Sequence, residues 1–205
     1  MKNSIMPRPL LLVISAPSGA GKTTLGKMLL DEFCNMRRSV SCTTRTKRTG
    51  ETSGRDYIFL TPARFRKKLA GGFFLEAAEV HGHCYGTPRA AVADNLKRGR
   101  DVLLIIDVQG ARRVRNMLRK GENGALKAAF VDVFVLPPDM KELKRRLTDR
   151  GQEDNAEMRL RLKNARDEMR AGVEFKYQVV NDKLDAAYEK LRSIVIAEHC
   201  RNLVV

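Results

Sequence analysis

The stretch Leu10-Leu-Leu-Val-Ile-Ser15, followed by Ala16-Pro-Ser-Gly-Ala-Gly-Lys22-Thr23-Thr24-Leu25, sets the architecture of this 205-residue chain. Its first half is a continuous apolar run between Pro9 and Pro17, typical of a strand buried on both faces of a parallel sheet. Its second half is a glycine-rich loop that leads into a helix, which we expect to end near Phe33. The order of strand, glycine-rich loop and helix indicates a phosphate-binding unit.

The loop matches the pattern GxxxxGK[ST] at every fixed position except the first, where Ala16 replaces glycine. Backbone N–H groups of such a loop converge on phosphate oxygens, and the helix dipole favours negative charge there. Lys22 is expected to reach the outer phosphates, and the Thr23 hydroxyl to bind the Mg²⁺ that bridges them. The residues predicted to hold the donor nucleotide in this loop are Ala16, Pro17, Ser18, Gly19, Ala20, Gly21, Lys22, Thr23 and Thr24.

Further core elements lie downstream of the loop. Residues 102–106 and 130–136 repeat the buried-strand pattern, and each is followed by a helical pattern, which predicts parallel βα units. A last helix begins near Leu184, where apolar residues recur at a spacing of three and four. The chain should therefore form an α/β fold with a central parallel sheet.

Between the first two core strands, residues 39–94 have a different composition, rich in Thr, Arg and Gly, with strand-like pieces such as residues 56–60. Thr61-Pro62 and Thr87-Pro88 each indicate a helix N-cap followed by proline at the first helical position, and Gly99 is placed to end the second helix. This segment is predicted to be an inserted lobe.

Residues 139–170 are dense in Arg, Lys, Glu and Leu, with one break at Gly151. They predict two charged helices joined by a short turn. A mobile lid would have this pattern, but composition alone favours a solvated helical hairpin.

Composition limits the class of protein. With 43% hydrophobic and 31% charged residues the chain is expected to fold as one domain with insertions. Apolar runs such as residues 10–14 are far shorter than the roughly 20 residues that span a bilayer, and we expect neither a membrane segment nor a targeting segment. The 4 cysteines form no CxxC pair, which predicts a reducing cytoplasm without a disulfide framework.

The formal net charge of +15 predicts a phosphate-bearing partner, either a nucleotide or a nucleic acid. An aromatic content of 6% without tryptophan argues against a nucleic-acid-stacking surface. His81-Gly-His83-Cys84 contains three possible metal ligands, but no second cluster completes a zinc site.

The segment Ser41-Cys-Thr-Thr-Arg45-Thr-Lys-Arg48-Thr-Gly50-Glu51-Thr-Ser-Gly54-Arg-Asp56-Tyr57 resembles guanylate kinases. Almost the whole chain shares the resemblance, through Glu76, Tyr85-Gly86-Thr87, Asp107-Val-Gln109-Gly110, Leu136-Pro-Pro, Arg150-Gly151, Arg161 and Asn181-Asp182-x-Leu-Asp185. The resemblance implies a three-layer P-loop kinase with an inserted α+β lobe and a helical lid. The implied division is a core of residues 1–38, 95–137 and 172–205, a GMP-binding lobe of residues 39–94, and a lid of residues 138–171.

The activity implied by the resemblance is transfer of the γ-phosphoryl group of MgATP to GMP or dGMP, which gives ADP and GDP or dGDP in guanine nucleotide recycling. The partners would be these small nucleotides, and the chain would act in the cytoplasm as a monomer or homodimer. The lobe and the lid are expected to close and exclude water, because ATP would otherwise be hydrolysed.

In the site implied by the resemblance, an acceptor phosphate dianion must be held near the donor despite mutual repulsion, and Arg45 and Arg48 would supply planar, bidentate charge for it. Tyr57 and Tyr85 would add hydroxyl donors. The resemblance also places Ser41 at this site, supported by Glu51.

Guanine presents two N–H donors beside a keto oxygen, an edge that a carboxylate fits. Glu76 and, by the resemblance, Asp107 would accept from the donors, while Thr87 donates to the keto oxygen. Adenine would leave the carboxylate unsatisfied, at a cost of about 1–3 kcal/mol.

The resemblance assigns catalysis to charge neutralisation by Lys22, Arg48, Arg150 and Arg161, and contact with the adenine or ribose to Asn181 and Asp182. No general base is needed, because the acceptor phosphate is already anionic. Ile105 stands where the family usually has the first acid of D-x-D. Either Asp107 then both contacts guanine and helps to arrange Mg²⁺, or Thr23 and the phosphates mainly hold the metal.

Two other functions remain open from the sequence. One is a non-catalytic phosphopeptide-binding module of guanylate kinase type, against which the intact Lys22 and Thr23 argue. The other is a related P-loop kinase with another phosphorylated acceptor, against which Glu76 and Thr87 argue.

Overall fold

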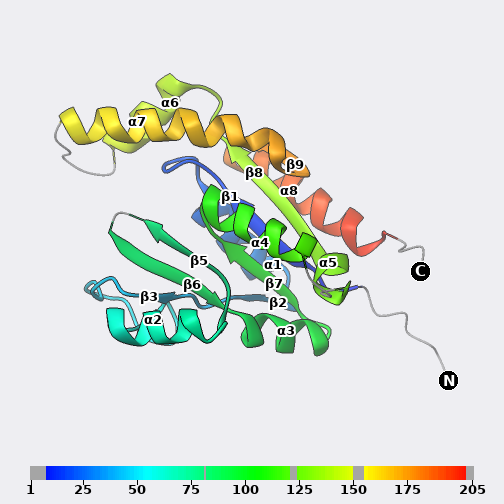
Figure 1. Ribbon diagram of the computed structural model, residues 1–205. Coiled ribbons are helices and arrows are strands. Elements are labelled where there is room, and N and C mark those ends of the chain that lie inside the picture. Colours follow the sequence, from blue (N-terminus) through cyan, green and yellow to red (C-terminus); the bar gives the residue numbers. More distant parts are fainter. Residues whose placement is uncertain (1–7, 81, 121–123, 150–154, 202–205) are drawn as a thin grey trace.

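The computed structural model describes residues 8–80, 82–120, 124–149 and 155–201. Its centre is a parallel five-stranded sheet with the strand order β2-β7-β1-β8-β9 (Figure 1). The strands are β1 (Leu11–Ser15), β2 (Met36–Arg38), β7 (Asp101–Ile105), β8 (Phe130–Leu136) and β9 (Tyr177–Val180). The predicted strands at residues 10–15, 102–106 and 130–136 are confirmed to within one residue at each end.

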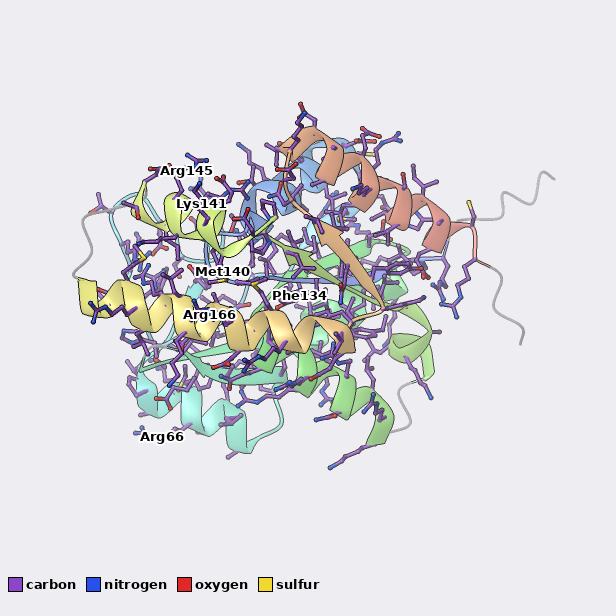
Figure 2. The ribbon with its side chains drawn as sticks, turned by 90° about the horizontal axis from the view of Figure 1, so that it is seen from above. Arg66, Phe134, Met140, Lys141, Arg145 and Arg166 are labelled. Carbon is purple, nitrogen blue, oxygen red and sulfur yellow. The ribbon has the colours of Figure 1, made fainter. Side chains whose placement is uncertain are left out.

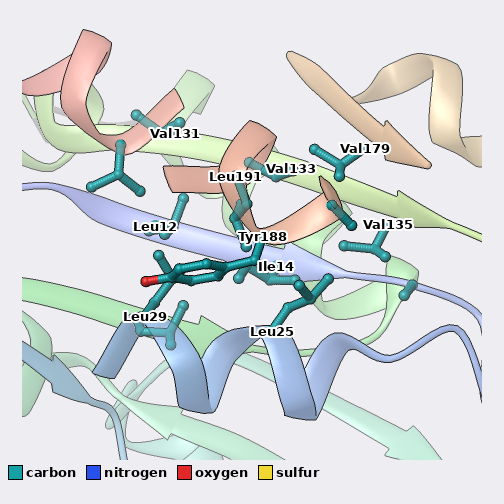
Figure 3. Packing of buried hydrophobic residues seen from close by; sticks show 14 of the residues in the cluster. Leu12, Ile14, Leu25, Leu29, Val131, Val133, Val135, Val179, Tyr188 and Leu191 are labelled. Atoms are coloured by element: carbon teal, nitrogen blue, oxygen red, sulfur yellow. The ribbon is translucent and has the colours of Figure 1, made fainter. Parts of the chain in front are cut away.

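Every residue of β1 is buried, because helices cover both faces of the sheet. Leu12 and Ile14 pack on one face with α1 (Lys22–Glu32) and α8 (Leu184–His199), as Figure 3 shows. Leu11 and Val13 point to the other face, since side chains alternate along a strand. The three-layer α/β fold predicted from the sequence is confirmed.

The second face of the sheet is covered by the helices that follow the core strands. α4 (Val108–Lys120) contributes Val114 and Leu118 to the cluster there, and α5 (Gly124–Ala129) ends beside it at Ala129. Burial of one such aliphatic side chain contributes about 1.5–3 kcal/mol relative to exposure. The two clusters hold β1 in place, and β1 in turn positions the glycine-rich loop.

A second sheet has four strands in the order β4-β3-β6-β5. They are β3 (Cys42–Thr43), β4 (Ile58–Phe59), β5 (Phe74–Val80) and β6 (His83–Pro88), so the strand-like piece predicted at residues 56–60 is shorter. Helix α2 (Pro62–Ala70) covers this sheet and stacks Phe65 on Phe74, with ring centroids 4.6 Å apart. The Thr61 hydroxyl caps α2 by accepting from the Arg64 N–H at 3.3 Å, as predicted.

The prediction that Thr87 caps the next helix is wrong. Thr87 is a residue of β6, and its hydroxyl donates to Glu76 on β5 at 2.7 Å. Helix α3 (Arg89–Lys97) begins after Pro88 and has no side-chain cap, and Gly99 follows it with a φ of 72°. The cross-strand hydrogen bond takes the hydroxyl that the local pattern assigns to the helix. Helix α3 also crosses residue 94, the predicted end of the inserted lobe.

Helices α6 (Met140–Thr148) and α7 (Asn155–Arg170) lie together at one end of the molecule, away from the four-stranded sheet (Figure 1). Asp139 caps α6 by accepting from the Glu142 N–H at 2.7 Å. Seen from above, α6 and α7 run beside each other with Met140 between them (Figure 2), where it packs on a small cluster of Leu143, Leu147 and Ala165. Both predicted helices are present, whereas the predicted break at Gly151 lies outside the described residues.

Candidate active site

The glycine-rich loop between β1 and α1 has a backbone that only glycine adopts easily at two positions, since φ is 86° at Gly19 and 95° at Gly21. A side-chain carbon at Gly19 would lie 3.1 Å from both Leu143 and Leu147 of α6, and one at Gly21 would lie 2.3 Å from Asn181 Nδ2. Ala16 is only 2% exposed and belongs to the core cluster. The alanine therefore fits a packing position, not the turn itself.

The start of α1 can receive anions. No side chain caps this helix end, and its first turn holds no acidic residue. Thr23 and Thr24 are exposed there, and Lys22 Nζ lies 3.4 Å from the Ala16 carbonyl oxygen. Backbone amides without a side-chain cap, a lysine and an exposed hydroxyl group are suited to binding a phosphate chain with its Mg²⁺.

Asn181 supports the loop from behind. Its side chain is 5% exposed and donates from Nδ2 to the Ala20 carbonyl oxygen at 2.9 Å. Arg146 on α6 donates to the carbonyl oxygens of Asn181 at 3.1 Å and Asp182 at 3.3 Å. Arg146 was not predicted as a site residue, although its spacing of four from Glu142 on a predicted helix was a signal.

A cavity of about 220 Å³ lies between the two sheets. Six predicted site residues line it, namely Lys22, Ser41, Tyr57, Glu76, Tyr85 and Asp107. They come from α1, from β5, β6 and the end of β7, and from loops of the inserted segment. The fold thus brings a phosphate-loop lysine and the predicted guanine-binding carboxylates to one cavity.

Glu76 is the most buried acid of this cavity, with 6% of its surface exposed. Burial raises the pKa of Glu76, the Thr87 hydrogen bond opposes that effect, and the charge of Asp107 adds to it. Asp107 Oδ1 accepts from the Gly110 N–H at 2.8 Å and so caps the start of α4. The two carboxyl groups are fixed in position by neighbouring protein groups.

Arg45 is also held in position. Arg45 Nη2 donates to Glu51 Oε1 at 2.7 Å, and the guanidinium lies 5.4 Å from the Tyr57 ring centroid. Glu51 Oε2 also accepts from the Arg48 N–H at 2.8 Å, so the supporting position predicted for Glu51 is present in the structure. The hydrogen bond from Arg45 lowers the pKa of Glu51. The Arg48 side chain is exposed and is not among the residues that line the cavity.

A larger cavity of about 510 Å³ separates α7 from the loop. Ser18, Asp107 and Gln109 line one side, and Arg161, Asn164 and Glu168 on α7 line the other. Arg161 Nη2 donates to Glu157 Oε1 at 2.8 Å on the same helix. Arg150, predicted to act with Arg161, lies outside the described residues.

Comparison with known proteins gives the family. A family model described as guanylate kinase matches residues 8–198. This chain belongs to the guanylate kinase family. The family indicated by the sequence motifs is therefore confirmed.

Individual family members align with most of this chain. Guanylate kinase of Caldanaerobacter subterraneus subsp. tengcongensis is 42% identical over 198 residues, which cover 97% of this chain and 92% of that relative. Guanylate kinase of Dechloromonas aromatica is 48% identical over 187 residues, which cover 91% of this chain and 88% of the relative. The crystal structure of guanylate kinase from Anaplasma phagocytophilum has a TM-score of 0.76 and 33% identity, covering 96% of this chain and 89% of that chain.

Ile105 stands where the resemblance to guanylate kinases implies the first acid of D-x-D. Its side chain packs against the core cluster under α1, where a carbon added at Gly26 would lie 2.6 Å from Ile105 Cδ1. Ile105 also lines the smaller cavity beside Lys22. An apolar side chain thus occupies the space beside the phosphate site, and Asp107 is the nearby acid on that strand end.

Two further observations concern classes of site and location. Among the residues that the structure describes, no group of three or more His, Cys, Asp or Glu side chains could hold a metal ion, and His81 of the His-Gly-His-Cys motif is outside them. No helix in the described part of the chain is long and apolar enough to cross a membrane.

Proposed function

We propose that the chain transfers the γ-phosphoryl group of MgATP to GMP or dGMP, giving ADP and GDP or dGDP. Membership of the guanylate kinase family over residues 8–198 supports this reaction. The observation that carries the choice of acceptor is the buried carboxyl group of Glu76, which lines a cavity that Lys22 also lines and accepts from the Thr87 hydroxyl at 2.7 Å. A carboxylate at that depth matches the N–H donors of guanine.

The residues act by binding, orientation and charge neutralisation. Lys22 and the loop amides would hold the outer phosphates of ATP, while Arg45, Arg48, Tyr57 and Tyr85, with Ser41, would hold the acceptor phosphate. Thr23 would hold the Mg²⁺ ion, which would neutralise charge on the donor phosphates. Arg150 and Arg161 would add charge from the lid as the phosphoryl group moves.

The division into core, GMP-binding lobe and lid is part of the proposal. Two separate sheets and the separate helix pair α6–α7 support it. Closure of lobe and lid on both nucleotides would exclude water. Small-angle scattering should show compaction when GMP and a non-transferable ATP analogue are added together.

A cytoplasmic location, and action as a monomer or homodimer, also belong to the proposal. The free state of Cys34, Cys42, Cys84 and Cys200, which are all described, supports a reducing compartment. A phosphopeptide-binding module has no observation in its favour, because the loop keeps Lys22, Thr23 and both positive-φ glycines.

The test is an ADP-release assay with MgATP and a panel of acceptors, namely GMP, dGMP, AMP, UMP, CMP, IMP and none. We expect full turnover with GMP and dGMP, weaker turnover with IMP, which lacks the exocyclic amine, and none with AMP, UMP or CMP. Turnover with AMP equal to that with GMP would contradict the base assignment. If folded protein binds GMP but shows no turnover with any acceptor, the phosphopeptide-binding module would be favoured.

A further inference from the structure

Glu168 on α7 lines the larger cavity and has no role in the proposed function. Arg161, Asn164 and Glu168 follow one another on α7 at intervals of three and four, so they share the helix face that lines the larger cavity. Ser18 of the loop and Asp107 at the end of β7 line the same cavity from the other side. Glu168 thus lines this cavity opposite the glycine-rich loop, where the donor phosphates are proposed to bind.

The end of α7 that carries Glu168 is fixed to the core. Beyond it, Gly172 packs so closely on Phe134 that an added carbon would lie 2.7 Å from the ring. Glu174 accepts from Arg112 Nε at 2.9 Å and from Arg115 Nη2 at 3.0 Å, both on α4. Arg161 lies two turns further out, about 10 Å along the helix. Glu168 therefore lies toward the end of α7 that is held against the core, whereas Arg161 lies further from it.

Lys22 lines the neighbouring smaller cavity, which shares Asp107 with this one, and its charge acts on the Glu168 carboxyl group. Burial raises the pKa of Glu168 to about 7, the charge of Lys22 opposes that rise, and the charge of Asp107 adds to it. Near neutral pH the carboxyl group is therefore divided between its two protonation states. The titratable and charged groups that line this cavity or act on Glu168 are Lys22 from α1, Asp107 after β7, Glu79 from β5, and Arg161 and Asp167 from α7 itself.

We propose that Glu168 is a positioning residue for Lys22: its carboxylate balances the ammonium before the donor binds, and it takes up one proton when the donor phosphates engage Lys22. The inference rests on the proposed function, because it requires MgATP at the loop. Once phosphate oxygens contact Lys22, an ionised Glu168 would face another anion across a partly buried cavity. The proton comes from solvent, and the neutral carboxyl group can donate a hydrogen bond where the carboxylate would repel.

The affinity for MgATP should fall as pH rises. Below about pH 6 Glu168 is already protonated, so MgATP binding takes up no proton there. As pH rises through 7, binding must bring the proton with it, and affinity falls. We expect the dissociation constant of MgATP to rise about three- to tenfold between pH 6 and pH 8.5.

The experiment is calorimetric titration of the full chain with MgATP, without GMP, in two buffers that differ in ionisation enthalpy. At pH 7 the wild type should take up a substantial fraction of a proton, and E168Q none. E168Q should bind MgATP as tightly as the wild type at pH 6 and about three- to tenfold more tightly at pH 8.5. The matched control is D167N, because Asp167 is the adjacent carboxylate, 59% exposed and paired with Arg170. It should behave as the wild type.

Equal proton uptake by E168Q and the wild type would overturn the inference, as would equal pH dependence of their affinities. If E168Q does not fold, judged by thermal melting, Glu168→Met of similar length takes its place with the same expectation. The GMP-dependent ADP-release assay is run on the same wild-type sample. If the wild type turns over GMP but E168Q takes up as many protons as the wild type, only the role of Glu168 is overturned. If the wild type binds MgATP but does not turn over GMP, the proposed function is overturned.

Discussion

The donor loop and the acceptor cavity are built in opposite ways. The loop is one contiguous run of residues whose backbone amides are proposed to bind the donor phosphates, and its shape depends on two positive-φ glycines and an uncapped helix end. The acceptor cavity is built from side chains of β5, β6 and β7 and from loops, held by the Glu76–Thr87 and Arg45–Glu51 hydrogen bonds. A backbone site can be predicted from a short motif, whereas a side-chain site depends on how distant strands align.

Lys22 lines the acceptor cavity although it belongs to the donor loop, so its loss should give the largest effect. We expect Lys22→Met to lower kcat by about 10²- to 10³-fold, because a charge that stabilises the moving phosphoryl group is removed. GMP affinity, measured by equilibrium titration, should change far less. A comparable loss of GMP binding would show that the two sites are not separable at this residue.

Glu76→Gln should act on the acceptor side alone. Replacing a buried acceptor oxygen with an amide donor leaves guanine and Thr87 with a poor partner, so kcat/KM for GMP should fall about 10- to 100-fold. The KM for MgATP should stay within about twofold of the wild type. Glu79→Gln on the same strand, where Glu79 is exposed, is the control. Equal losses for both nucleotides would contradict the assignment of the base site.

Gly21→Ala tests the backbone site without touching a charge. The φ of 95° and the 2.3 Å approach to Asn181 Nδ2 should reduce the free energy of unfolding by about 1–3 kcal/mol, measured by denaturant titration. Gly50→Ala, at a φ of 84° with nothing within 4 Å, separates the backbone strain from the clash. If both variants lose the same stability, the close contact with Asn181 contributes nothing.

The smallest expected effect is a pH dependence of GMP binding. Because burial raises the pKa of Glu76, its carboxylate form is complete only above that raised pKa and is lost as pH falls through it. The KM for GMP should therefore rise severalfold as pH is lowered from 8 towards 5. The rise should begin at a pH above about 4.3, the ordinary pKa of glutamate. Glu76→Gln should keep only the dependence due to the acceptor phosphate itself. An identical profile in the variant would remove Glu76 as the titrating group.

The sequence predicted those parts of the fold that depend on local pattern. β1, β8 and α8 are each specified by a contiguous apolar run or a helical period, and the loop is specified by its glycine pattern. All of these were found. The β5–β6 hairpin and the short edge strand β2 were not predicted, because their pairing partners are set by tertiary contacts. Thr87 was misassigned for the same reason, since the Thr-Pro pattern carries no information on Glu76 across the hairpin.

The predicted site shows the same limit. Family motifs led to Ser41, Tyr57, Glu76, Tyr85 and Asp107, which the fold gathers in one cavity, and their roles remain predictions. Glu168 was missed, because a glutamate on a charged helix has no local mark that distinguishes it from solvated neighbours. Its distance of seven residues from Arg161, two helical turns, was the available signal.

The hydrogen bond from Asn181 to the Ala20 carbonyl joins residues 161 positions apart. During synthesis the glycine-rich loop leaves the ribosome early, but the amide that fixes its shape, together with β9 and α8, follows only after the rest of the fold. A nascent chain therefore carries the complete phosphate motif long before it has the complete phosphate site. We therefore expect ATP binding to require the finished fold, and shortened chains that end before residue 181 should lack it.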